Sequence, residues 1–333
     1  MIISRTPFRV SFFGGGTDYS AWYQDHNGAV LATTIDKYCY ITCRYLPPFF
    51  EHRSRIIYSK MEHVRQSIDE IDHPSVREVL RLLKIHEGVE IHHDGDLPAR
   101  TGLGSSSSFT VGLLNSLYAL KGQMVTKEKL AREAILVEQG MIKENVGCQD
   151  QTQAAYGGFN LIEFGGTNHL RVHPLTIPPA MLNLLQDHLM LFFTGFSRNA
   201  SVIAKAQIDN IPQKKAELSR MHEMVQEAVG ILNAGQLLKF GRLLDESWKL
   251  KRTLSDKISS STIDDLYATA IKAGAIGGKL LGAGGGGFVL LFAEPAKQDK
   301  IRQALKGLLE VPFKFENLGT QIIFYQPETD AIK

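Results

Sequence analysis

The sequence predicts an α+β protein made of two domains. Its 333 residues are 44% hydrophobic and 22% charged, which is typical of a globular chain long enough for two domains. Strand-like and helix-like stretches occur in both halves, and the pattern changes at "HPLTIPPAMLNLLQ". We therefore expect an N-terminal domain over 1–180 and a C-terminal domain over 181–333.

Charge and cysteine content limit the partners and the compartment. The net charge of +2 is too small to indicate nucleic acid or a membrane surface as a partner. Cys39, Cys43 and Cys148 are too few and too scattered for a disulfide framework, and Cys39 and Cys43 are expected to be buried core thiols. The N-terminus does not resemble a signal peptide, and the apolar run 280–293 is too short and glycine-rich to span a bilayer. We expect a cytoplasmic protein.

The first half is expected to contain strands followed by helices. Residues 2–13 and 28–46 are rich in β-branched and aromatic side chains, as strands are. Residues 75–88 have the apolar period of a helix, and Thr126 is suited to cap a helix over 126–144. The remaining elements expected here are a strand that starts at 89 and a helix over 105–122.

The second half is expected to be richer in helix. Residues 189–195 form an apolar run typical of a buried strand, and the helix over 260–275 begins with a capping-box spacing at Ser261 and Asp264. The other elements expected here are helices around 197–210, 213–233, 236–254 and 296–310, and strands at 286–294 and 320–326.

Three glycine clusters lie beside these elements, at Gly14–Gly16, at 102–108 and at 282–287. One such cluster alone can be a simple turn, but three flanked by strands and helices indicate a function. The third leads into a strand rather than a helix, which argues against a dinucleotide-binding fingerprint although it matches GxGxxG.

The second cluster has the features of a phosphate-binding loop. In "LPARTGLGSSSSF" (97–109) a loop runs into the start of a helix, where unpaired N–H groups and the helix dipole favour an anion. Serine hydroxyls add donors and can bind Mg²⁺, whereas the common GxxxxGK[ST] loop is absent from the sequence. The expected phosphate-binding residues are Gly102, Leu103, Gly104, Ser105, Ser106, Ser107 and Ser108.

Two carboxylates occupy unusual positions. Glu138 shares the apolar helix face of Ala134 and Ile135, so it either binds a metal or reaches solvent from the edge of that face. Asp150 lies between two glutamines, and is either a base that orients a substrate or an ordinary loop or capping residue. Transfer of a phosphoryl group to a hydroxyl requires such a carboxylate, together with amides, a metal and a cation.

Taken together, "PFRVSFFGGGTDY", "LPARTGLGSSSSF" and "KLLGAGGGGFVLLF" resemble, in order, three motifs of the GHMP kinases. The resemblance spreads over nearly the whole chain. It implies a two-domain α+β fold with ATP and its acceptor in the cleft between the domains. The phosphates of ATP would lie on the second motif.

The resemblance also implies roles for single residues. Ser106 and Glu138 match the family's Mg²⁺ ligands. Asp150 matches the catalytic base, and Arg9 matches the arginine that accompanies it and stabilises the reacting charge. Asp18 matches an aspartate that binds sugar hydroxyls. Further substrate contacts are expected from Gly15, Gly16, Thr17, Gly284 and Gly285.

Departures from the family pattern narrow the expected substrate. Galactokinases carry Glu-His where this chain has Gly15-Gly16, whereas the segments 247–259 and 274–288 resemble kinases of D-glycero-D-manno-heptose 7-phosphate. Those enzymes phosphorylate the anomeric hydroxyl and make the 1,7-bisphosphate for nucleotide-activated heptose in surface polysaccharides. A kinase for a fucose- or galactose-like sugar, and a non-catalytic sugar sensor on the same fold, are the alternatives.

The expected ligands are therefore ATP, Mg²⁺ and a sugar phosphate, and a homodimer is one assembly that the sequence allows. A phosphate on the sugar needs cations beyond those that bind ATP. Arg198 is the first candidate, because it follows a buried strand and a guanidinium suits phosphate; it could equally be a solvated residue at a helix start. Lys279 and Lys249 are weaker candidates.

Overall fold

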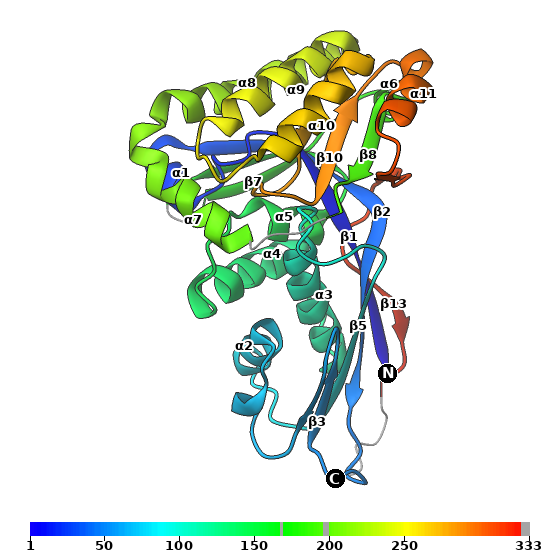
Figure 1. Cartoon of the computed structure of the whole chain (residues 1–333). Helices are drawn as coiled ribbons and strands as arrows, with labels where there is room; N and C mark the ends of the chain where they lie inside the picture. Colours follow the sequence, from blue (N-terminus) through cyan, green and yellow to red (C-terminus); the bar gives the residue numbers. More distant parts are fainter. Residues whose placement is uncertain (167–168, 196–199, 328–333) are drawn as a thin grey trace.

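The computed structural model describes residues 1–166, 169–195 and 200–327 and contains two β-sheets (Figure 1). The larger sheet has nine strands, with β13-β1-β2-β5-β3-β4 as its main order; β6 and β12 also pair with β2, and β7 pairs with β6. The smaller sheet has the order β11-β8-β10-β9. The predicted α+β class is confirmed.

The large sheet is built on a long antiparallel ladder between β1 and β2. Its register runs from Ile2 opposite Cys43 to Phe13 opposite Leu31. Cys39 and Cys43 are buried in β2, as predicted. Strands β3, β4, β6, β7 and β12 were not expected. The strands of this sheet are β1 (Ile2–Phe13), β2 (Gly28–Tyr45), β3 (Ser54–Ile57), β4 (Met61–Val64), β5 (Val89–Gly95), β6 (Phe159–Gly165), β7 (His169–Pro174), β12 (Phe315–Glu316) and β13 (Gln321–Tyr325).

Helices α2 to α5 lie along one side of this sheet (Figure 1). Helix α3 packs against β1 and β2, and α5 packs against α3 and α4. Thr126 caps α4 by accepting a hydrogen bond from the N–H of Lys129, as predicted. The helices in this half are α1 (Ser20–His26), α2 (Pro74–Leu82), α3 (Ser105–Leu120), α4 (Lys127–Ile135), which continues as a π-helical segment over Leu136–Met141, and α5 (Gln149–Tyr156).

The small sheet is antiparallel and packs against α9 through β9, whereas α8 packs on α9 and on β1 and β2 of the large sheet. Helices α8, α9 and α10 lie together at the top of Figure 1. Ser260, and not Ser261, caps α10, because it is the Ser260 hydroxyl that accepts from the N–H of Ile263. The elements are β8 (Leu189–Phe193), β9 (Gly277–Leu280), β10 (Phe288–Phe292), β11 (Leu309–Glu310), α6 (Pro179–Asp187), α7 (Ala200–Asn210), α8 (Lys215–Asn233), α9 (Leu237–Arg252), α10 (Ser261–Ala273) and α11 (Pro295–Ala304).

The two halves of the sequence do not form two separate hydrophobic cores, because one cluster of buried residues includes side chains from both halves. Strands β12 and β13 return to β2 and β1, so residues 315–325 belong to the first sheet although the expected boundary assigns them to the second domain. Phe240 of α9 packs edge-on against Phe12 and Phe13 of β1, at centroid distances of 5.5 and 5.1 Å. The end of β1 is therefore fixed by both halves. Among the described residues, no helix has the length and apolar character needed to cross a bilayer.

Candidate active site

Arg9 and Asp150 form a two-point ion pair between β1 and the first turn of α5. The Arg9 Nε donates to Oδ1 of Asp150 at 2.7 Å, and Nη2 donates to Oδ2 at 2.8 Å. The remaining Nη1 donates to the carbonyl oxygen of Gly102 at 2.7 Å. Arg9 is only 3% exposed. The guanidinium thus fixes the Asp150 carboxylate next to the predicted phosphate-binding loop.

The start of α3 is open to an anion. Its N-cap is Gly104, whose φ of +76° suits glycine, and no side chain accepts a hydrogen bond there. The first N–H groups of the helix are thus left to a ligand. The four serines do not act alike, because Ser107 and Ser108 are buried and donate to Glu138 and to the carbonyl of Pro7, whereas Ser106 is exposed.

Glu138 lies in the π-helical segment and is fully buried, so it does not reach solvent from the edge of the apolar face, which was one of the two alternatives. Ser107 donates to its Oε2 at 2.8 Å, and the amide of Gln151 donates to the same oxygen. The other oxygen, Oε1, has no hydrogen-bond partner among the residues that the structure describes. Burial raises the pKa of Glu138 to about 7, although the hydrogen bonds from Ser107 and Gln151 act to lower it.

These features fit a Mg²⁺ ligand. A buried carboxylate oxygen without a partner is costly unless a cation binds it. Mg²⁺ usually takes one or two protein carboxylates together with substrate phosphates, so the absence of a cluster of three acidic, His or Cys ligands in the described ranges is no obstacle. The structure brings Glu138 to Ser107; Ser106, predicted as the second ligand, makes no hydrogen bond to it, and its metal role stays a prediction.

Asp18 is a second buried carboxylate near Asp150. The backbone N–H of Gly16 donates to its Oδ1, and the amide of Gln149 donates to Oδ2, both at 2.9 Å. A Cβ on Gly147 would lie 1.8 Å from Oδ2, so any other residue there would displace the Asp18 carboxylate. Burial and the charge of Asp150 raise the pKa of Asp18, although both hydrogen bonds oppose the shift. The two carboxylates predicted for the acceptor side are thus close together.

The residues of the first glycine cluster have different roles. A Cβ on Gly14 would lie 1.8 Å from the carbonyl oxygen of Ala29, so this glycine serves strand packing and not a ligand. A Cβ on Gly15 would have the amide nitrogen of Gln149 as its nearest neighbour, 3.9 Å away, so a side chain has room there. The buried hydroxyl of Thr17 donates to the carbonyls of Gly14 and Ala29, so it supports the turn; its predicted contact with substrate is not indicated by this geometry.

The second and third glycine motifs touch through their backbones. A Cβ on Gly102 would lie 2.4 Å from the carbonyl of Leu281, and one on Gly282 would lie 2.4 Å from the Cα of Gly102. The third motif is held in turn by the loop before α10. There the N–H of Gly285 donates to the carbonyl of Ile258 at 2.8 Å, and Gly284 packs on the same residue. The third motif therefore closes against the phosphate-binding loop.

Two buried lysines from the second half approach these groups. Lys279 on β9 donates to the carbonyl of Phe12 at 2.9 Å, and burial holds its pKa well below the usual range. Lys251 on α9 donates to the carbonyl of Gly282. Lys251 was not among the predicted site residues, although it lies three residues after buried Trp248 on the apolar face of α9. Lys249 is 68% exposed and pairs with Asp245, away from these groups.

Of the predicted site residues, Arg198 lies outside the described part of the chain. The structure brings together Arg9, Asp18, Asp150, the start of α3 and the third motif. Glu138 joins this group through Ser107 and Gln151.

This arrangement agrees with comparisons to known proteins. Residues 74–158 match the GHMP kinases N terminal domain and residues 226–310 match the GHMP kinases C terminal domain, together about half of the chain. The D-glycero-alpha-D-manno-heptose 7-phosphate kinase of Campylobacter jejuni is 29% identical over 316 residues, which cover 92% of this chain and 93% of that protein. The galactokinase of Pyrococcus furiosus is 26% identical, covering 91% and 92%.

Solved structures give the same fold. The crystal structure of a D-glycero-D-manno-heptose 1-phosphate kinase from Bacteroides thetaiotaomicron superposes with a TM-score of 0.80 at 24% identity, covering 96% of this chain and 98% of that one. The resemblance drawn from the three motifs is confirmed: the chain belongs to the GHMP kinase family and is an ATP-dependent phosphotransferase.

Proposed function

We propose that this chain transfers the γ-phosphoryl group of ATP to the anomeric C1 hydroxyl of D-glycero-D-manno-heptose 7-phosphate. The products are ADP and the heptose 1,7-bisphosphate, a precursor suited to nucleotide-activated heptose. The 29% identity to a heptose 7-phosphate kinase along nearly the full length of both chains supports this substrate. The similarity to a galactokinase at 26% makes another sugar the alternative to test.

One observation carries the chemistry: Arg9 fixes Asp150 beside an uncapped helix start. We assign the N–H groups at the start of α3 to the phosphates of ATP. The C1 oxygen attacks the γ-phosphorus, the bond from that phosphorus to the bridging oxygen breaks, and ADP leaves with that oxygen. Asp150 accepts the proton of the hydroxyl. Asp18 would orient the sugar by accepting hydrogen bonds from its other hydroxyls.

Mg²⁺ when bound would neutralise charge on the phosphates. Glu138 is the residue that would hold it, because its buried Oε1 has no hydrogen-bond partner within residues 1–166, 169–195 and 200–327. Ser106 and Ser107 are the candidate hydroxyl ligands. Gln151 positions the glutamate through a hydrogen bond that leaves Oε1 free.

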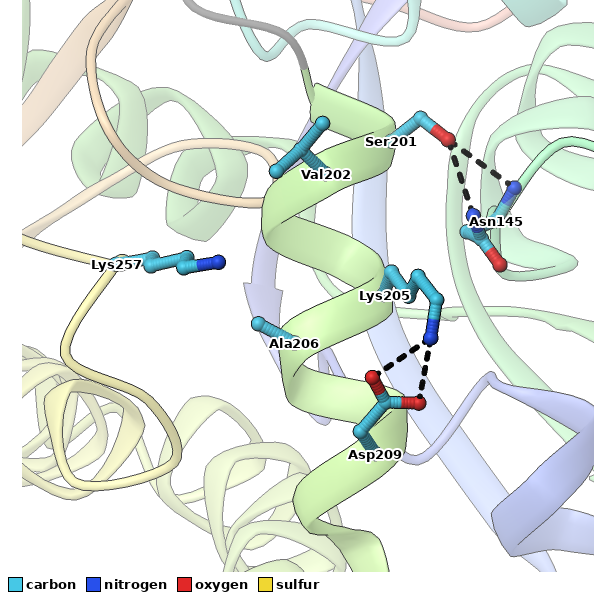
Figure 2. A pocket seen from close by; sticks show the side chains of 7 residues that line it. All are labelled: Asn145, Ser201, Val202, Lys205, Ala206, Asp209 and Lys257. Atoms are coloured by element: carbon cyan, nitrogen blue, oxygen red, sulfur yellow. Dashed lines mark hydrogen bonds and ion pairs between the residues drawn. The ribbon is translucent and has the colours of Figure 1, made fainter.

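A cavity of about 180 Å³ supports an acceptor that carries its own phosphate (Figure 2). Lys205 on α7 pairs with Asp209 at 2.8 Å, while Lys257 extends toward α7 from the opposite side. Lys257 precedes Ile258, which holds the third motif. On the other side Asn145 lies two residues before Gly147, which packs on Asp18. We assign the 7-phosphate to this region, with Arg198 as the predicted additional cation.

The test is a coupled ADP-release assay with heptose 7-phosphate, the free heptose, fucose, galactose and mannose. We expect the highest kcat/KM with heptose 7-phosphate. Phosphorus NMR of the product identifies the phosphorylated carbon, and we expect C1. A higher kcat/KM with any unphosphorylated sugar would reject the assigned substrate, and ligand-induced thermal stabilisation without turnover of any sugar would favour the sensor.

A further inference from the structure

We propose that the ammonium group of Lys251 binds the phosphoryl group while it passes from ATP to the acceptor. This inference rests on the kinase reaction proposed above, but not on the identity of the sugar. It gives this lysine a direct contact with the reacting atoms, in addition to the hydrogen bond that it donates to Gly282 of the third glycine motif.

The position of Lys251 is set by its contacts. Its side chain leaves the last turns of α9, is only 5% exposed, and donates to the carbonyl of Gly282. Gly282 packs directly on Gly102, whose carbonyl accepts from Arg9. One short chain of contacts therefore joins Lys251 to the phosphate-binding loop and to the Arg9–Asp150 pair.

The charges around Lys251 are incompletely balanced. Arg9 is already paired with Asp150, and Asp18 accepts from Gly16 and Gln149. Lys279, the other buried lysine, donates to a carbonyl. In the described ranges, no carboxylate lies within ion-pair distance of either lysine. Arg9, Lys251 and Lys279 thus lie near only two carboxylates, both of which accept hydrogen bonds from other residues, so an incoming anion would stabilise the charged form of the lysines.

Titration agrees with this geometry. Burial and the charge of Arg9 lower the pKa of Lys251 to about 8, while Asp18 and Asp150 act to raise it. The charge of Lys251 acts in turn on Lys279. Among the described residues, Arg9, Asp18 and Asp150 are thus the charged groups that shift the pKa of Lys251, and Lys279 is the group that Lys251 shifts. An ammonium has three N–H donors, and one carbonyl occupies only one of them.

The transferring phosphoryl group is the anion that fits this position. It must move from the start of α3 toward a hydroxyl near Asp150, and Lys251 reaches the third motif where that motif meets Gly102. As the bond to the acceptor oxygen forms and the bond to ADP breaks, negative charge is spread over the three remaining phosphoryl oxygens. A cation there stabilises the transition state more than bound ATP.

The experiment compares Lys251→Met and Lys251→Arg with Lys249→Met, a control two residues away on the same helix whose ammonium is exposed and paired with Asp245. Calorimetry measures the affinity for Mg²⁺·ADP alone and for Mg²⁺·ADP with aluminium fluoride and sugar, which mimics the group in transfer. We expect Lys251→Met to weaken the second complex about 10²-fold and the first by about threefold or less. Lys251→Arg should recover at least part of the loss, and Lys249→Met should bind both as the wild type does.

A purely structural role gives a different result. If Lys251 only holds Gly282, both complexes weaken equally and the melting temperature falls, which would overturn the proposal. The wild type offers a test that needs no substitution. Binding of the aluminium fluoride complex at about pH 8.5 should take up a proton, because an anion favours the charged lysine. No proton uptake would also overturn it.

Failure of the proposed function looks different again. If heptose 7-phosphate is not a substrate, the same measurements are made with whichever sugar of the panel the wild type phosphorylates. If no sugar is phosphorylated and the wild type shows no tighter binding with aluminium fluoride than without it, both proposals fall.

Discussion

Gln151 donates a buried hydrogen bond to Glu138, and this is one of three contacts made by consecutive residues of α5. Gln149 donates to Asp18, Asp150 pairs with Arg9, and Gln151 reaches Glu138. The first turn of one short helix thus positions the groups assigned to the acceptor, to the proton and to the metal. Displacement of this turn would disturb all three together.

Asp150→Asn should lower kcat about 10²-fold or more, because an amide cannot accept the hydroxyl proton. The effect is measured with the coupled assay at saturating ATP and sugar. Asp299→Asn is the control, since Asp299 is a highly exposed residue on α11 that pairs with Arg302. A kcat within about threefold of the wild type for Asp150→Asn would remove Asp150 from the mechanism.

Glu138→Gln should stabilise the metal-free protein at pH 8 but not at pH 4.5. The pKa of Glu138 is raised from 4.5 to about 7 in the fold, so between these values the folded state binds more protons than the unfolded state. Stability therefore falls as pH rises through this window, and the full cost, on the order of 3 kcal/mol, is present above about pH 7. The free energy of unfolding in urea at pH 4.5, 6 and 8 measures the difference.

With Mg²⁺ and ATP bound, the wild type should become more stable at pH 8 than Glu138→Gln. A bound cation favours the ionised glutamate, so the wild type should gain more stability from Mg²⁺·ATP than Glu138→Gln, and the variant should need more Mg²⁺ for half-maximal activity. Equal Mg²⁺ titrations for the two proteins would show that the glutamate has only a structural role.

Gly14→Ala and Gly15→Ala should have different effects: the first should lower stability, and the second should change KM for the sugar. At Gly14, φ is +83° and the added Cβ would meet the carbonyl of Ala29, so we expect a loss of stability larger than about 1 kcal/mol. At Gly15 the space is open, so the fold should keep its melting temperature while KM for the sugar changes. A melting temperature lowered equally by both substitutions would mean that Gly15 is also structural.

Arg198→Ala and Lys257→Met should each raise KM for heptose 7-phosphate about tenfold, because each would remove a cation from the assigned phosphate site. KM for ATP should stay unchanged. Lys300→Met on α11 serves as the control. If the free heptose and its 7-phosphate lose kcat/KM by the same factor, the assigned phosphate site is wrong.

The sequence was most informative where a local rule was strong. Periodicity placed Glu138 on an apolar face, and its complete burial confirmed that interpretation. The same rule applied to α9 would have found Lys251, which shares the buried face of Trp248. Lys251 also lies in a last turn with Lys249 and Arg252, where cations commonly favour the helix dipole, so charge alone does not distinguish it from its neighbours.

Long-range pairing could not be read from local patterns. The strand ending at Tyr325 was predicted, but its pairing with β1 was not, since nothing in a short segment specifies a partner some 300 residues away. The cap of α10 was placed at Ser261 rather than Ser260, because adjacent serines satisfy the same rule. Gly14 was grouped with Gly15 and Gly16 as one glycine cluster, although the backbone of Ala29 is what approaches Gly14.

The backbone contact between Gly102 and Gly282 also bears on how the protein matures. The loop assigned to nucleotide is completed by a segment about 180 residues further along the chain, and the sheet beneath it is completed by β13. Contacts of such large sequence separation form late in folding. We therefore expect a ribosome-bound chain to be unable to bind nucleotide until nearly all of it has been translated. Incomplete copies of the enzyme would then have no kinase activity.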